Sequence, residues 1–79
     1  MHKEKNKLIA LIEQEDKIVT VSHAREYFGG CIPGWQGFAA SHGFEWIQVV
    51  RHGLKASELL ATNDAMAINL VNYVYTGEK

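Results

Sequence analysis

The sequence has little cysteine, no long apolar run and no excess of charge of either sign. Cys31 is the single cysteine among 79 residues, so a disulfide within the chain is excluded and a reducing compartment fits best. The apolar run Leu8 to Ile12 is too short for a secretory signal or a membrane span, which predicts a cytoplasmic protein without a membrane partner. The formal net charge of -1 lacks the basic excess that is usual in domains that bind mainly phosphates.

Motifs that carry chemistry are also missing. Cys31, His23, His42 and His52 match no spacing known for metal sites, so we predict no metal. No glycine-rich phosphate-binding loop is present, and we predict no cofactor. Cys31 and a histidine could formally act together as a nucleophile, but no motif supplies an oxyanion hole. We therefore interpret Cys31 as a structural cysteine. We therefore predict no catalytic residues and no enzymatic activity.

The sequence does contain the composition of a globular protein and two similar helix ends. Hydrophobic residues make up 47% of the chain and charged residues 22%. Ser41-His42-Gly43-Phe44 and Arg51-His52-Gly53-Leu54 each place a histidine before a glycine and a large apolar residue after it. Glycine just past a helix takes the left-handed conformation without steric cost, and the next apolar residue commonly folds back onto the last turn. Both segments therefore predict short helices that end at a glycine.

Helical spacing of apolar residues recurs along the chain. It predicts helices near residues 3–15, 23–28, 33–42, 44–52 and 62–75, with one to two further helical turns over residues 55–61. Ser22 is the expected N-cap of the second helix, Pro33 suits the first position of the third, and Thr62 or Asn63 is expected to cap the last. The predicted fold is all-α, a single small domain over residues 1–79 with four to five short helices.

One segment breaks the helical pattern. Every residue from Ile18 to Val21 is β-branched, which suits a short extended segment. No second strand of comparable strength is present to pair with it, so we predict an extended connector near residues 18–21 and no sheet. Gly34 and Gly37 lie within the third helix, where each costs about 1 kcal/mol relative to alanine. We expect these glycines to let another backbone come close.

Residues 20–42 also have the outline of a helix-turn-helix, and they loosely resemble the excisionase-like and MerR-like module. A recognition helix needs polar and basic side chains for base edges and phosphates. The helix at 33–42 contains no arginine or lysine, which leaves Arg25, Arg51 and Lys55 for contacts to the DNA backbone alone. DNA is therefore retained as the alternative partner, behind another protein.

The aromatic residues predict a protein partner. Two tryptophans and three tyrosines are more than a core of this size is expected to bury, and both residue types are enriched in binding hot spots. Phe44 and Trp46 are assigned to the core. The candidate interaction surface combines aromatics expected to be partly exposed with a basic cluster: Trp35, Tyr73, Tyr75, Arg51, His52 and Lys55. A homodimer through the last helix is a further candidate assembly, because small helical chains often complete their cores in this way.

A longer outline runs from about Ala24 to Val71. Its parts are Cys31, an aromatic-bearing helix, His42-Gly43-Phe44-Glu45-Trp46, Val50-Arg51-His52-Gly53-Leu54, Leu60-Ala61-Thr62 and Asp64-Ala65-Met66-Ala67. In this outline the chain resembles small uncharacterised proteins encoded in phages and prophages. The resemblance implies a mobile-element origin and a helical fold, and it carries over no site residues. We therefore predict a small non-catalytic phage- or prophage-derived protein that binds a host or phage protein through exposed aromatics, with a helix-turn-helix-like DNA-binding regulator as the alternative.

Overall fold

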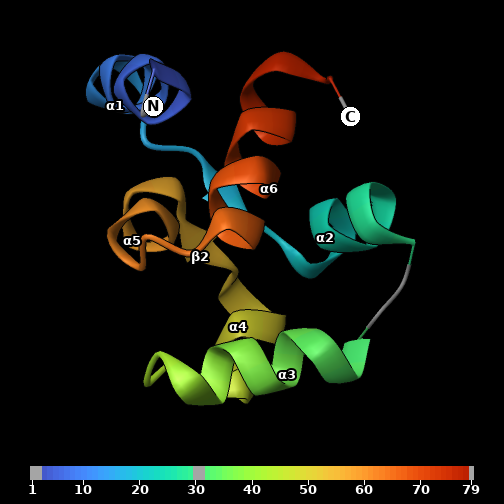
Figure 1. Cartoon of the computed structure of the whole chain (residues 1–79). Helices are drawn as coiled ribbons and strands as arrows, with labels where there is room; N and C mark the ends of the chain where they lie inside the picture. The colour runs from blue at the N-terminus through green and yellow to red at the C-terminus, as the bar shows by residue number, and fades with distance from the viewer. Residues whose placement is uncertain (1–2, 30–31, 79) are drawn as a thin grey trace.

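The computed structural model of the chain describes residues 3–29 and 32–78, so Cys31 lies outside the described residues. The chain forms six helices and two short strands over this part: α1 (Lys3–Gln14), β1 (Ile18–Val19), α2 (Val21–Phe28), α3 (Ile32–Ser41), α4 (Trp46–His52), β2 (Leu54–Lys55), α5 (Ala56–Ala61) and α6 (Ala65–Thr76) (Figure 1). The predicted mostly helical fold is confirmed. The described residues contain six helices in place of the four to five predicted, because residues 56–61 form a helix of their own.

Residues 18 and 19 are extended, as predicted for the connector, but the prediction that no sheet forms is wrong. β1 and β2 pair in antiparallel fashion, with Ile18 opposite Lys55 and Val19 opposite Leu54. The backbone N–H of Ala56 extends the pairing by donating to the carbonyl oxygen of Lys17 at 2.9 Å. The partner strand has two residues and directly follows the end of α4, so the sequence around it carries no strand pattern of its own.

The helix end at Gly43 has the predicted geometry. Gly43 has a φ of +76°, and its N–H donates to the Ala40 carbonyl at 3.3 Å, while the Phe44 N–H donates to the Ala39 carbonyl at 2.8 Å. These are the two hydrogen bonds of a Schellman motif. The centroids of the Phe44 and Phe38 rings are 6.4 Å apart, so the apolar residue after the glycine packs on the last turn of α3.

The helix end at Gly53 is different. Its φ is +70° and its N–H donates to the Val49 carbonyl at 2.9 Å, and Leu54 continues directly into β2. A Cβ at Gly53 would lie 2.6 Å from the carbonyl oxygen of Val19, so β1 occupies the space that a side chain would need. A Cβ at Gly37 would meet no atom within 4 Å, so the close backbone approach predicted there is wrong.

The predicted N-caps are wrong by one or two residues, both for Ser22 before α2 and for Thr62 or Asn63 before α6. Thr20, two residues before Ser22, caps α2: its Oγ1 accepts the His23 N–H at 3.3 Å, and His23 Nδ1 accepts the Thr20 N–H at 2.9 Å. His23 thus takes the place that glutamate or glutamine has in a capping box. Asp64 caps α6, because its Oδ1 accepts the Met66 N–H at 2.9 Å.

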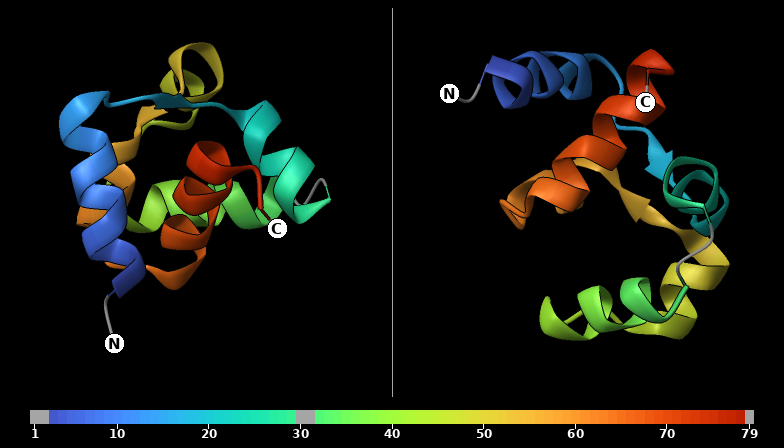
Figure 2. Two further views of the ribbon diagram at one scale, coloured as in Figure 1. Left: turned by 90° about the horizontal axis from the view of Figure 1, so that it is seen from above. Right: turned by 45° about the vertical axis from the view of Figure 1, so that its right-hand side comes forward.

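Helix α6 lies at the centre of the fold, in contact with α1, α2 and α5 (Figures 1 and 2). Its side chains Ala67, Leu70 and Val71 are fully or almost fully buried. They join the other core residues contributed by the surrounding helices and by β1. These three side chains of the last helix are therefore inside the molecule, and the homodimer through this helix considered from the sequence stays a prediction.

Candidate functional site

Helix α4 carries apolar side chains in two adjacent stripes. Trp46 and Val49, three residues apart, are half-buried and face a core cavity. Ile47 and Val50, also three residues apart, are 49% and 51% exposed. At about 100° per residue the four side chains span about 160° of the helix circumference. One face of a surface helix is narrower than that, so the second stripe remains in contact with water.

The strand pair extends the exposed stripe of α4. Directly opposite residues of antiparallel strands project to the same side, so Ile18 and Lys55 share the outer side of the pair while Val19 and Leu54 face inward. Ile18 is 45% exposed, and its Cγ2 lies 2.8 Å from the position that a Cβ of Gly53 would take. Because Gly53 directly follows α4, Ile18 lies beside the C-terminal end of that helix.

Basic side chains border these aliphatic residues. Arg51 lies one turn after Ile47 on the same side of α4, and Lys55 lies opposite Ile18. Both cations and the neighbouring His52 are exposed, and none of the three forms an ion pair within residues 3–29 and 32–78. The nearest fixed carboxylate, that of Glu58, accepts the backbone N–H of Lys55 at 3.1 Å. We refer to Ile18, Ile47, Val50, Arg51 and Lys55 as the α4–ribbon surface.

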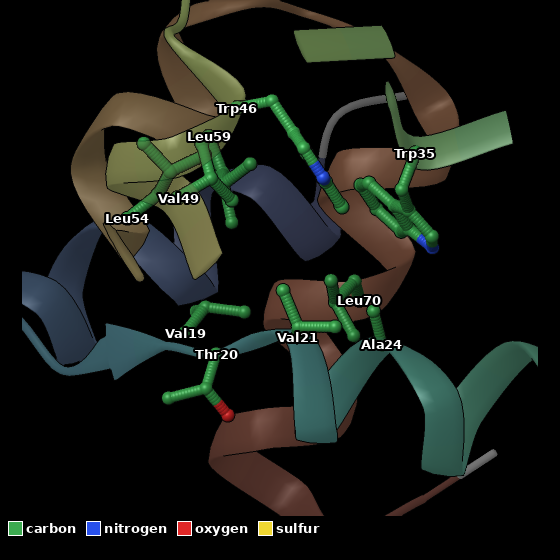
Figure 3. Close-up of a pocket in the computed structure, with 10 residues that line it drawn as sticks. All are labelled: Val19, Thr20, Val21, Ala24, Trp35, Trp46, Val49, Leu54, Leu59 and Leu70. Atoms are coloured by element: carbon green, nitrogen blue, oxygen red, sulfur yellow. The ribbon is translucent and has the colours of Figure 1, made fainter. Parts of the chain in front are cut away.

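A narrow cavity lies where α2, α3, α4, the strand pair and α6 meet (Figure 3). Its volume is about 20 Å³, and its lining is almost entirely apolar, with Trp35, Trp46 and Leu70 among the largest side chains. This volume is close to the space that a single water molecule needs. The cavity is therefore a packing gap in the core and is too small to hold an organic ligand.

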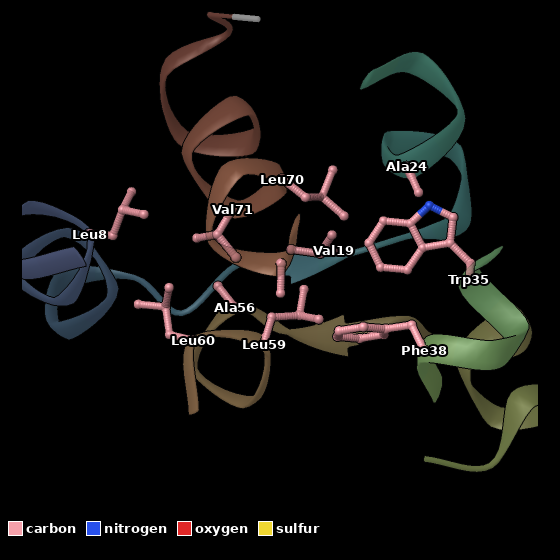
Figure 4. Packing of buried hydrophobic residues seen from close by; sticks show 11 residues of the cluster. Leu8, Val19, Ala24, Trp35, Phe38, Ala56, Leu59, Leu60, Leu70 and Val71 are labelled. Carbon is pink, nitrogen blue, oxygen red and sulfur yellow. The ribbon is translucent and has the colours of Figure 1, made fainter. Parts of the chain in front are cut away.

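The prediction that Trp35 is partly exposed is wrong. Its side chain is 8% exposed, and its ring centroid lies 5.3 Å from that of Phe28 and 5.2 Å from that of Phe38. The indole points toward Ala24 and the core residues of α6 (Figure 4). Trp35 and Phe38 share one stripe of α3, and packing that stripe inward buries both rings. Trp46, which was assigned to the core, is half-buried at the first turn of α4.

The two candidate tyrosines connect elements within the molecule. The Tyr73 hydroxyl donates to Glu26 Oε1 at 3.3 Å, which joins α6 to α2. Desolvation by the neighbouring side chains raises the pKa of Tyr73 above its ordinary value of 10.0, and the negative charge of Glu26 raises this pKa further. The Tyr75 hydroxyl accepts the Lys17 N–H at 2.9 Å and donates to the Glu15 carbonyl at 2.6 Å. Both tyrosines therefore have partners within the chain.

The six candidate residues do not form one surface. Arg51, His52 and Lys55 lie together at the end of α4 and in β2, whereas the three aromatic candidates lie in the core or on α6. Sequence reasoning missed the exposure of Ile18, Ile47 and Val50. The wide arc of apolar residues on α4 could have indicated that Ile47 and Val50 are exposed. No local signal identified Ile18, because its outward direction depends on pairing with β2.

A further pair of polar side chains connects two elements of the fold. His42 Nε2 lies 3.8 Å from Asp64 Oδ2, which connects the end of α3 to the cap of α6. Within the described ranges, no three histidine, cysteine, aspartate or glutamate side chains are close enough together to hold a metal ion. In the same part of the chain, every helix is too short or too polar to cross a membrane.

Comparison with known proteins gives no assignment. No family model, no curated protein and no solved structure matches the chain.

Proposed function

We propose that this chain is a small non-catalytic interaction protein that binds another protein through the α4–ribbon surface. The observation that carries the proposal is the exposure of three large aliphatic side chains: Ile47 and Val50 on α4 are 49% and 51% exposed, and Ile18, beside the C-terminal end of this helix, is 45% exposed. Full burial of a large aliphatic side chain gains about 1.5–3 kcal/mol. A partner that covers these three half-exposed side chains therefore gains about 2–4 kcal/mol from them.

The cations give the same surface a means of selecting its partner. Arg51 and Lys55 have no carboxylate partner in the described part of the chain, so an acidic group on the binding protein can pair with either of them. Such rim charges raise association rates and suppress wrong partners more than they add affinity. The resemblance to small phage- and prophage-encoded proteins supports a mobile-element origin, with a host or phage protein as the partner.

The proposal changes which side chains make the contact. The sequence suggested exposed aromatics, but Trp35 is buried, and Tyr73 and Tyr75 are hydrogen-bonded within the chain. The aliphatic side chains of α4 and β1 take their place. Trp35→Ala is consequently a poor probe of binding, because emptying a buried tryptophan site costs about 3–5 kcal/mol of stability.

DNA binding has less support. Helices α2 and α3 follow one another as in a helix-turn-helix, which makes α3 the recognition helix. The exposed residues of α3 are small or uncharged: Gly34, Gln36, Gly37, Ala40 and Ser41. No cation on this face can neutralise a phosphate, and one amide is available to read a base edge.

The test is affinity capture from bacterial lysate, with and without phage infection, using the wild-type chain, Ile47→Ser and Val50→Ser. Both substitutions are at exposed positions and are expected to leave the fold intact. A protein retained by the wild type should bind each variant about three- to tenfold more weakly, since each half-exposed side chain supplies about a third of the 2–4 kcal/mol gained on burial. Gln48→Ser is the matched control, because Gln48 is exposed on the same helix but does not belong to the α4–ribbon surface.

Two outcomes contradict the proposal. Equal loss of the captured protein with Gln48→Ser and Ile47→Ser shows that any change on α4 removes binding and that the α4–ribbon surface does not select the partner. Retention of duplex DNA in a gel-shift experiment, with a steep decrease at higher salt, assigns the function to the helix-turn-helix-like alternative.

A further inference from the structure

An open groove runs between α1 and α5. Its volume is about 270 Å³, and the side chains along it are Ile9, Ile12, Leu60, Ala61, Lys5 and Glu13, with Ser57 at its edge. Ile9 is 42% exposed and lies outside the α4–ribbon surface. The groove thus combines an apolar lining with one cation and one carboxylate.

The charges of this groove are arranged symmetrically about Ile9. Lys5, Ile9 and Glu13 follow one another at intervals of four residues, so they lie along one side of α1 at spacings of about 6 Å. The Lys5 ammonium also donates to Asn63 Oδ1 in the turn before α6, which holds it at one end of the groove. A positive and a negative group therefore stand one helical turn to either side of an exposed isoleucine.

We propose that a second copy of this chain occupies the groove, with the two α1 helices packed antiparallel about a two-fold axis at Ile9. In this arrangement Lys5 of each copy faces Glu13 of the other, and each Ile9 is covered by the opposite groove. A parallel arrangement would place like charges against each other. A self-complementary patch of this kind is what an isologous two-fold interface requires.

The surrounding residues favour the same occupant. Ser57 and Ala61 on α5 are small, so a second helix can approach the groove closely. Ala67, Leu70 and Val71 of α6 are buried within each copy and are not available to a second copy. None of the groove residues belongs to the α4–ribbon surface, so the dimer does not depend on the proposed function.

The test uses charge reversal in the full chain, measured by sedimentation equilibrium at low salt, where surface pairs are screened least. The mass of the wild type should rise from the monomer value of 8.9 kDa toward twice that value as concentration increases. Lys5→Glu alone and Glu13→Lys alone each create two like-charge contacts, and each should weaken the dimer at least about tenfold. An equimolar mixture of the two variants restores both opposite-charge contacts and should recover the wild-type mass.

Lys7→Glu is the matched control, because it changes the net charge equally from an exposed position on another side of α1. It should dimerise as the wild type does. Recovery in the mixture also shows that both variants are folded. The proposal is overturned by a wild type that remains monomeric up to about 1 mM, by a mixture no heavier than its components, or by Lys7→Glu weakening the dimer as much as Lys5→Glu.

Discussion

The two glycines with positive φ at the ends of α3 and α4 are required for different physical reasons. Gly43 and Gly53 have φ values of +76° and +70°. A Cβ at Gly43 would meet no atom within 4 Å, whereas one at Gly53 would meet the Val19 carbonyl oxygen at 2.6 Å. The first glycine is required by its backbone angle alone. The second is required by its backbone angle and by the approach of β1.

This difference predicts unequal costs for the same substitution. Gly43→Ala should lower the free energy of unfolding by about 1–2 kcal/mol, the cost of placing a residue with a Cβ in the left-handed region. Gly53→Ala should lower it by about 3 kcal/mol or more, because the β1 backbone must also move. Urea unfolding followed by circular dichroism measures both values. Equal losses for the two variants would show that β1 does not lie against Gly53.

At the scale of elements, the positions of the helices could be predicted from the sequence, but the packing of the helices against one another could not. The apolar stripe Trp35, Phe38 and Ala39 predicts α3, and Gly43 predicts its end, because these signals lie within a few residues of one another. Which tryptophan enters the core depends on how α3 and α4 pack against the remaining helices. That packing buries Trp35 and leaves Trp46 half-buried, an outcome that no local pattern encodes.

The contact between α2 and α6 predicts a dependence of stability on pH. Tyr73 on α6 donates to Glu26 on α2, and its pKa is raised above 10.0 in the folded state. Because the folded-state pKa is raised, the protonated phenol stabilises the fold at pH values below the unfolded-state pKa. This contribution is lost as the pH rises through the folded-state pKa. Wild-type stability should therefore decrease more steeply than that of Tyr73→Phe as pH rises above about 10.

Urea midpoints at about pH 8 and about pH 11 measure the two slopes. Glu26→Gln removes the charge while keeping a hydrogen-bond acceptor, so its slope should lie between those of the wild type and Tyr73→Phe. Parallel slopes for all three proteins would exclude a shifted Tyr73 pKa.

At the scale of the whole molecule, a polar segment joins the N-terminal helix to the rest of the chain. Residues 15–17 break the apolar pattern of α1, and the sequence gives them no evident structural role. In the fold, the Asp16 carboxylate accepts the Ser57 hydroxyl at 2.6 Å and the Ser57 N–H at 3.0 Å. The Lys17 carbonyl accepts the Ala56 N–H, and the Lys17 N–H donates to the Tyr75 hydroxyl. These partners are distant in sequence, which is why pattern analysis could not find them.

Tyr75 makes the longest-range connection in this segment. Its hydroxyl accepts the Lys17 N–H and donates to the Glu15 carbonyl, and the Lys17 ammonium lies 5.1 Å from the centroid of its ring. Tyr75→Phe keeps the ring but leaves a backbone donor and a backbone acceptor without these partners. The variant should lose about 1–3 kcal/mol of stability, the net contribution of two hydrogen bonds.

Tyr27→Phe provides the matched control for this loss. The Tyr27 ring packs against Phe28 and Tyr73, and its hydroxyl forms no side-chain hydrogen bond within residues 3–29 and 32–78, so its removal should cost less than about 0.5 kcal/mol. Hydrogen exchange adds a local measurement, because the Lys17 amide should exchange faster in Tyr75→Phe and at the wild-type rate in Tyr27→Phe. If both variants unfold at the same urea concentration, the polar segment does not attach α1 to the C-terminal helix, and apolar packing through Leu8 alone must hold it.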